Sequence, residues 1–309
     1  MGDVLIIIGR IIAGLAVFTL GLYLAKLAFS LMTRSGIYQN RFLGQTVRIA
    51  ILTLVAVIAF QQIWIAGDIA KSAFGRSKIA PFGNKSGYEL VFHDEFNGNR
   101  LDTSKWSTQF YWGRTHNTHY MTYFAPDTFE VTDGKLRIKA EKRRGSRPEY
   151  KGGLINTFER FAWQYGYFEM KAKLPKGKGL WPAFWLSSNS KEWPPEIDIF
   201  ELLGHEPNKV YLTIHWRDAS GKHKYRQRAY VGADFSRDYH IFAVEWTPTE
   251  IIWYIDGIEK YRNNRGVPQV PMCLMAAMTI GGDWPGAPDR TTSFPAYMDI
   301  DFIRVFKKK

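Results

Sequence analysis

From residue 88 onward the chain is divided into short runs of β-branched and aromatic residues, separated by Gly, Pro, Asn and Asp. No long amphipathic helical pattern interrupts these runs. Many short strands with regular turns, over about 220 residues, are typical of an all-β sandwich. The runs that predict strands are Tyr88–His93, Phe129–Thr132, Lys135–Ala140, Gly166–Ala172, Val210–Trp216, His240–Trp246, Ile251–Ile255, Met272–Thr279 and Met298–Phe306.

Tight turns are predicted at two Asp-Gly pairs, Asp133-Gly134 and Asp256-Gly257. Asp-Gly is a common hairpin dipeptide, because both residues tolerate the positive φ angles of a two-residue turn. Each pair stands between two of the predicted strands. A sandwich built from such hairpins can carry an open groove on one of its sheets.

One predicted strand carries a row of acids, Glu196-Ile197-Asp198-Ile199-Phe200-Glu201. Side chains in a strand alternate faces, so Glu196 and Asp198 share one face and Ile197 and Ile199 point into the core. Glu201 is an odd number of residues from both acids and would face away. One extra residue, a β-bulge, would return it to their face. The sequence therefore predicts a bulged strand with Glu196, Asp198 and Glu201 (the acid row) in an open groove.

Three kinds of site fit this spacing: a catalytic pair, a Ca²⁺ site and a plain solvated face. Retaining glycoside hydrolysis needs two carboxyl groups about 5–5.5 Å apart, one a nucleophile and one a general acid. The charge of Asp198 between two glutamates would separate their pKa values, which such chemistry can use. Spacing alone leaves the three readings open.

Tryptophan residues surround the acid row in the sequence and favour a sugar ligand. Sugar rings present apolar C–H faces that stack on aromatic rings. Trp181, Trp185, Trp193 and Trp284 are candidate substrate-binding residues, and Trp193 and Trp284 stand in Gly/Pro-rich loops. A core role remains the alternative for Trp185 and Trp246. His215, alone in a predicted strand, either bonds substrate or the acid row or is structural.

The first 70 residues have a different composition, with apolar runs at 4–24 and 49–66. Each run is close to the roughly 20 residues that cross a bilayer. Residues 1–86 carry nine basic and two acidic residues, so 9 − 2 = +7 of the net charge of +12 lies there. Four cations and no acid separate the runs, which places that loop in the cytoplasm. Membrane topology thus explains the basic excess, and we expect no nucleic-acid partner.

A helical transmembrane hairpin over residues 1–70 would place everything after it outside the cytoplasm, in the periplasm or cell exterior of a bacterium with an inner-membrane anchor. The alternatives are a signal peptide, or one spanning helix with a second helix lying on the membrane. Residues 71–87 read as a linker. Residues 20–70 also resemble the transmembrane-helix repeat found near small mechanosensitive channels, which implies a homo-oligomer formed through these helices.

The region 88–309 resembles glycoside hydrolase family 16. The acid row matches the bulged Glu-x-Asp-x-x-Glu signature of that family. The other matching segments, in the family's order, are Asp94–Gly98, Tyr165–Glu169, Trp181–Leu186, Val244–Trp246, Trp253–Gly257, Gly281–Gly286 and Asp301–Phe306. The resemblance implies a concanavalin-like jelly-roll sandwich and retaining endo-hydrolysis of β-glycans without a catalytic cofactor. It makes Glu196 the nucleophile, Asp198 its electrostatic helper and Glu201 the acid/base.

The bulged signature resembles laminarinases and bacterial exopolysaccharide glycanases, but two segments depart from the laminarinase pattern. Ala277 replaces the usual Asn before the Gly-Gly loop, and Asn117-Thr118-His119-Tyr120 replaces Asn-Glu-x-Gln. Both changes fall on a glucose-binding subsite, so laminarin itself is in doubt. Asn117 and Arg160 are candidate substrate-binding residues. Four arginines near predicted cleft loops leave room for an acidic polysaccharide: Arg114, Arg160, Arg217 and Arg290.

The resemblance also implies a structural Ca²⁺ on the convex side, held by Glu95, the carbonyl of Gly134 and Asp301. Ordinary turn and salt-bridge contacts are the alternative for these residues. We therefore expect a membrane-anchored retaining endo-β-glycanase acting on β-1,3 or mixed β-1,3-1,4 linkages. The competing functions are transglycosylation by the same acids, a non-catalytic glycan-binding module, and a channel-like subunit with an appended lectin domain.

Overall fold

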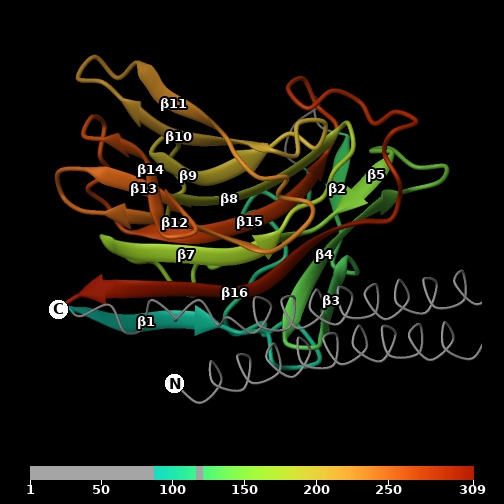
Figure 1. Ribbon diagram of the computed structural model, residues 1–309, viewed down its shortest axis with the longest axis horizontal. Helices are drawn as coiled ribbons and strands as arrows, with labels where there is room; N and C mark the ends of the chain where they lie inside the picture. Colours follow the sequence, from blue (N-terminus) through green and yellow to red (C-terminus); the bar gives the residue numbers. More distant parts are fainter. Residues whose placement is uncertain (1–86, 116–120) are drawn as a thin grey trace, which may run out of the picture. The chain divides into compact units, whose positions relative to one another are not determined.

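The computed structural model describes residues 87–115 and 121–309, and these residues form two stacked β-sheets (Figure 1). The strands are β1 (Tyr88–Asp94), β2 (Thr122–Phe124), β3 (Phe129–Thr132), β4 (Lys135–Lys142), β5 (Tyr150–Gly152), β6 (Leu154–Asn156), β7 (Gly166–Lys173), β8 (Leu180–Ser188), β9 (Glu196–Leu202), β10 (Lys209–Arg217), β11 (His223–Val231), β12 (His240–Trp246), β13 (Ile251–Ile255), β14 (Ile258–Asn263), β15 (Met272–Ile280) and β16 (Ala296–Lys308).

The larger sheet has the order β14-β13-β12-β7-β16-β4-β5-β2, with β1 paired to β16 and β3 to β4. The smaller sheet has the order β11-β10-β9-β8-β15-β6. Neighbours pair antiparallel throughout the described strands except β2 and β5. The predicted all-β sandwich is confirmed for this part of the chain, and every strand predicted from sequence is present.

Both predicted hairpin turns are confirmed. Asp133 and Gly134 have φ angles of 52° and 68° between β3 and β4, and Asp256 and Gly257 have 52° and 77° between β13 and β14. The chain changes sheets between β5 and β6 at Gly152-Gly153. A Cβ on Gly152 would lie 2.0 Å from the carbonyl oxygen of Met278, so only glycine permits this close passage.

The core lies between the two sheets and is apolar and aromatic. Phe200 of β9 meets Phe242 of β12 with ring centroids 4.3 Å apart. Trp246 is 1% exposed and belongs to this core, as the alternative for that residue predicted. Ile197 and Phe200 lie on the core side of β9, so the burial of that face fixes which side of the strand carries the acids.

The predicted membrane hairpin and most of the linker, residues 71–86, lie outside the described residues. Within residues 87–115 and 121–309, no helix is long and apolar enough to cross a membrane.

Candidate active site

A β-bulge in β9 brings the acid row to one face. Against β8, Phe184 pairs with Phe200 and Trp185 with Asp198, so Ile199 is the extra residue. Against β10 the register shifts over the same interval, between Tyr211 and Thr213. The predicted bulge is confirmed. Ile199 itself is buried, 1% exposed, so the extra residue also packs in the core.

A contact from the opposite sheet holds the bulge. The indole Nε1 of Trp253, on β13, donates a 2.8 Å hydrogen bond to the backbone carbonyl of Asp198. Trp253 is fully buried, and this bond satisfies both its own N–H and a carbonyl at the irregular part of the ladder. The position of the acid row is therefore fixed by the backbone and by packing between the sheets.

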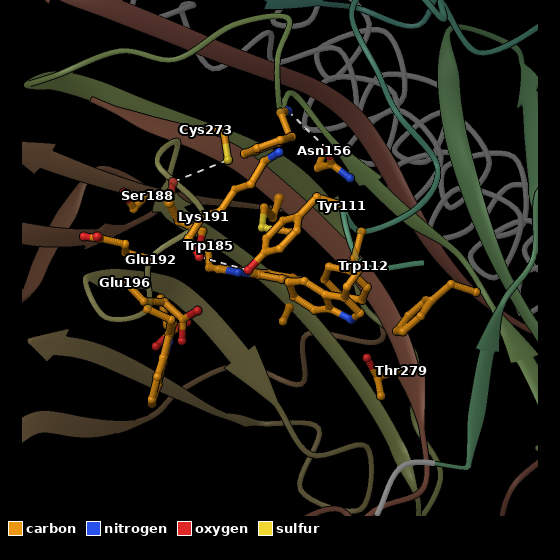
Figure 2. A pocket seen from close by; sticks show the side chains of 18 of the residues that line it. Tyr111, Trp112, Asn156, Trp185, Ser188, Lys191, Glu192, Glu196, Cys273 and Thr279 are labelled. Atoms are coloured by element: carbon orange, nitrogen blue, oxygen red, sulfur yellow. Dashed lines mark hydrogen bonds between the residues drawn. The ribbon is translucent and has the colours of Figure 1, made fainter. Parts of the chain in front are cut away.

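The three acids line a cavity of about 530 Å³ over the smaller sheet. Strands β8 and β15 form its floor with Trp181, Trp185 and Met275. Figure 2 shows Tyr111 and Trp112 beside Trp185, with Glu196 farther along the cavity. The full lining is Phe110, Tyr111, Trp112, Phe124, Asn156, Phe158, Trp181, Ala183, Trp185, Ser187, Ser188, Lys191, Glu192, Trp193, Glu196, Asp198, Glu201, Cys273, Met275 and Thr279.

Burial raises the pKa values of all three acids. It brings the pKa of Glu196 to about 8, with a further rise from Asp198 and opposing effects of His215 and a hydrogen bond from Trp193. It also raises the pKa of Asp198 to about 8. The pKa of Glu201 is well above its usual range, because of burial and then the charges of Asp198 and Glu196. Burial therefore favours the protonated, neutral form of these carboxyl groups at neutral pH, and a protonated carboxyl group can serve as a general acid.

Trp181 touches the acid row directly. Its indole Nε1 donates a 3.2 Å hydrogen bond to Oε1 of Glu201, which partly opposes the rise in the pKa of that carboxyl. The ring of Trp284 packs edge-on against Trp181, with centroids 5.3 Å apart, and against Tyr211 at 4.8 Å. Trp284 is 38% exposed and supports Trp181 from outside the cavity lining.

His215 lies beside the acid row. Its Nε2 is 3.3 Å from Oδ2 of Asp198 and 3.9 Å from Oε1 of Glu196. Its Nδ1 is 3.0 Å from Nε2 of His223 on β11. Burial lowers the pKa of His215, which favours the neutral ring. Of the two readings of this residue, contact with the acid row is the one that the structure supports.

An aromatic wall stands beside the histidine pair. The ring of Trp193 lies 4.8 Å from His223 and 5.7 Å from His215, and is 47% exposed. Tyr225 stacks on His215 from β11 with centroids 5.9 Å apart. Arg217 donates to the carbonyl of Trp193 at 2.9 Å and so holds the loop that carries the indole.

A second aromatic group, formed by Phe110, Tyr111, Trp112 and Phe158, was not predicted. Trp112 stacks on Phe110 with centroids 4.3 Å apart and planes 7° apart. Tyr111 donates to the carbonyl of Lys191 at 2.9 Å, which joins two distant loops. Tyr111 and Trp112 are 51% and 47% exposed, an unusual exposure for large rings and a signal of ligand contact. Their adjacency in an aromatic-rich loop was the available sequence signal.

Two of the arginines predicted near the cleft already donate hydrogen bonds to backbone carbonyls, and their predicted roles stay predictions. Arg160 is absent from the cavity lining and donates to the carbonyls of Thr103 and Phe158. Arg114 donates to the carbonyls of Thr108 and Phe124. A guanidinium whose donors are already satisfied by backbone oxygens offers less to an anionic ligand. Asn117 lies outside the described residues, so its predicted role stays a prediction.

The positions predicted to hold Ca²⁺ are occupied by ion pairs. Glu95 accepts two hydrogen bonds from Arg304, at 2.8 and 2.6 Å, and Asp301 lies 2.6 Å from Nζ of Lys171. A calcium ion bound through Glu95 would have to displace the guanidinium of Arg304 or share the carboxylate with it. These residues as arranged do not fit the ion, and the Ca²⁺ site stays a prediction. Among the described residues, His, Cys and acid ligand atoms gather within 4.8 Å only at Glu196, Asp198 and His215.

Comparison with known proteins places the chain in a family. A model of glycosyl hydrolases family 16 matches residues 95–303. The chain is 32% identical over 268 residues to glucan endo-1,3-beta-glucosidase A1 of Niallia circulans, covering 72% of this chain and 38% of that protein. It is 31% identical over 240 residues to endo-1,3-1,4-beta-glycanase EglC of Rhizobium meliloti, covering 70% and 51%.

A solved structure, the laminarinase catalytic domain of Thermotoga maritima, superposes with a TM-score of 0.64 at 33% identity, covering 72% of this chain and 100% of that one. The chain spans about half, or less, of the length of the two curated relatives. The acid row and the cavity around it lie inside the range that the family model matches, and the chain belongs to glycosyl hydrolases family 16.

Proposed function

We propose that this protein is a retaining endo-glycoside hydrolase that cleaves β-1,3 or mixed β-1,3-1,4 glucan by double displacement. The observation that carries the proposal is the bulge in β9, which gathers Glu196, Asp198 and Glu201 on one face of an aromatic-lined cavity. Two carboxyl groups facing one groove supply the nucleophile and the acid that this chemistry needs. The aromatic lining supplies stacking surfaces for sugar rings.

In the first step, the carboxylate of Glu196 bonds to the anomeric carbon while Glu201 gives its proton to the glycosidic oxygen, and the C–O bond breaks. In the second step, Glu201 takes a proton from water, whose oxygen bonds to the anomeric carbon as Glu196 leaves. The negative charge passes from Glu196 to Glu201 and back. The mechanism needs only one negative charge in the row at each stage, and burial, which raises the pKa values of all three acids, favours a row with few charges.

The substrate is a neutral glucan in this proposal. Three of the four arginines that suggested an acidic polymer donate to backbone carbonyls, namely Arg114, Arg160 and Arg217. Two exposed rings in the cavity lining, Trp112 and Trp193, suit a polymer that extends through an open groove. The printed names of the relatives include both β-1,3 and mixed linkages, and both are candidate substrates here.

We also propose that residues 1–70 anchor the enzyme in a bacterial inner membrane, with residues 88–309 in the periplasm or outside the cell. The support is the pair of apolar runs and the acid-free basic loop between them. Cysteine-scanning with a membrane-impermeant thiol reagent tests this topology. Labelling of a cysteine introduced at Ser86 in intact spheroplasts supports it, and labelling only after lysis contradicts it.

The decisive test of the chemistry is substitution of Glu196. Glu196→Gln should lose activity on every glucan that the wild type cleaves, because an amide cannot form the glycosyl ester. Glu196→Ala with azide should release a glycosyl azide of inverted configuration, detected by NMR. The exposed Glu89→Gln, on the far sheet, is the matched control. Near-wild-type activity of Glu196→Gln would overturn the role assignment.

A further inference from the structure

The side of the acid row that faces β10 has the ligand set of a transition-metal site. Glu196, Asp198 and His215 each offer one ligand atom, and these three atoms lie within 4.8 Å of one another. Two ligands on one tetrahedral zinc ion, each about 2.1 Å from it, are about 3.4 Å apart. Nε2 of His215 is 3.3 Å from Oδ2 of Asp198 and 3.9 Å from Oε1 of Glu196. Both distances are close to the separation that a shared ion requires.

Asp198 supplies an independent observation. Its side chain is 6% exposed, and its Oδ2 makes no hydrogen bond with any described residue. A buried carboxylate oxygen without a hydrogen bond loses hydration, and Nε2 of His215, 3.3 Å away, does not replace it with a hydrogen bond. A cation held by one ligand atom from each of Glu196, Asp198 and His215 would satisfy this oxygen.

His223 contacts the second ring nitrogen of His215. Its Nε2 lies 3.0 Å from Nδ1 of His215. When His215 donates its Nδ1 proton to His223, the Nε2 lone pair faces the two acids. Metal-bound histidines are held in this way by an acceptor on their second nitrogen, which fixes the tautomer and the ring orientation.

We propose that Glu196, Asp198 and His215 bind a divalent transition-metal ion of the zinc type, and that His223 orients the imidazole for it. Imidazole with carboxylates favours Zn²⁺ and Cu²⁺ over Ca²⁺ and Mg²⁺, which prefer all-oxygen sites with more ligands. The ion would replace the positive charge that protons supply to these buried acids. The cavity beside the ligands leaves its remaining coordination position open to water.

The ion would act as an inhibitor. It occupies the carboxylate that the proposed mechanism needs as nucleophile, so hydrolysis should stop while zinc is bound and return when a chelator removes it. This consequence rests on the proposed function, whereas zinc binding itself does not. Zinc in the surroundings of the cavity would thus switch the enzyme off reversibly.

The test is calorimetric titration of the chelator-treated full chain with ZnCl₂. We expect one tight site, weakened by at least about 100-fold in His215→Gln and by about 10-fold in His223→Gln. His205→Gln, an exposed histidine outside the cluster, is the matched control and should bind as the wild type does. His223 lies on an exposed edge strand, so its variant keeps the test valid if His215→Gln does not fold.

A crystal of the zinc-loaded protein should show an anomalous peak about 2.1 Å from the three ligand atoms. Equal zinc affinity in the wild type and both histidine variants, or a peak elsewhere, would overturn the proposal. Zinc binding by a protein that hydrolyses no glucan even after the chelator has removed the metal would count against the proposed function alone. Hydrolysis in a protein that binds no zinc would count against this inference alone.

Discussion

Glu169, on β7 of the larger sheet, should make the stability of this protein fall as the pH rises. Its side chain is 1% exposed, and its Oε1 makes no hydrogen bond with the described residues. Arg304 lies 3.7 Å from that oxygen and donates its two short hydrogen bonds to Glu95. Burial raises the pKa of Glu169 from 4.5 to about 7, against the partial opposing effect of Arg304.

The sign follows from proton binding. Between pH 4.5 and 7 the folded protein holds a proton on Glu169 that the unfolded chain has lost, so stability decreases with rising pH in that window. At 1.36 kcal/mol for each pH unit between the two pKa values, the loss reaches about 3 kcal/mol above pH 7. Glu169→Gln keeps the shape of the side chain and removes the charge, so it should escape this loss.

Urea unfolding of the wild type and Glu169→Gln, followed by tryptophan fluorescence from pH 4.5 to 8.5, measures the difference. The variant should gain about 3 kcal/mol relative to the wild type across this range, most of it between pH 5 and 7. Glu89→Gln, an exposed acid on the same sheet, controls for the removal of one negative charge. A difference that stays constant with pH would refute the reasoning, because no proton would then be linked to folding at this site.

Three substitutions test the site itself. Trp181→Phe removes the hydrogen-bond donor that lowers the pKa of Glu201. The alkaline limb of the pH profile of kcat/KM should therefore move to higher pH. A shift to lower pH would contradict this role of Trp181. Trp112→Ala removes an exposed stacking ring and should raise KM for long glucans by up to about tenfold with little change in kcat; an unchanged KM would remove this ring from the substrate path. Trp253→Phe leaves the Asp198 carbonyl without its donor and should cost about 1–3 kcal/mol of stability, measured by urea unfolding; a loss well below that would mean that the bulge is held by other contacts.

The strands that sequence predicted are those where apolar and polar residues alternate between turn signals. β11 was missed because it is an edge strand rich in Lys and Arg, a composition that protects sheet edges but hides the alternation. β8 was recognised as a tryptophan-rich motif, with Trp185 in a strand pattern, but its bounds were not predicted. The bulge in β9 was predictable because three acids at even and odd spacing have no common face in a regular strand.

The parts of the site that depend on distant contacts could not be predicted. Tyr111 donates a hydrogen bond to the carbonyl of Lys191, 80 residues away, and no local sequence pattern indicates this contact. His223 comes within hydrogen-bond distance of His215 because β11 pairs with β10, and the sequence does not show this pairing. Arg160 shows the converse: its guanidinium donates to backbone carbonyls that the sequence does not reveal, and its predicted contact with substrate stays a prediction.

The extra residue in β9 decides on which face of the strand each acid lies. That face depends on whether the number of residues between two acids is even or odd, and not on the exact number. Deleting Ile199 would leave Glu196, Asp198 and Glu201 at even separations, so a regular strand would still present all three to the groove. Deleting Ile197 removes the same number of atoms of the same kind, yet it turns Glu196 away from its partners. Two single-residue deletions in one strand should therefore have opposite consequences for hydrolysis, although neither touches a carboxylate.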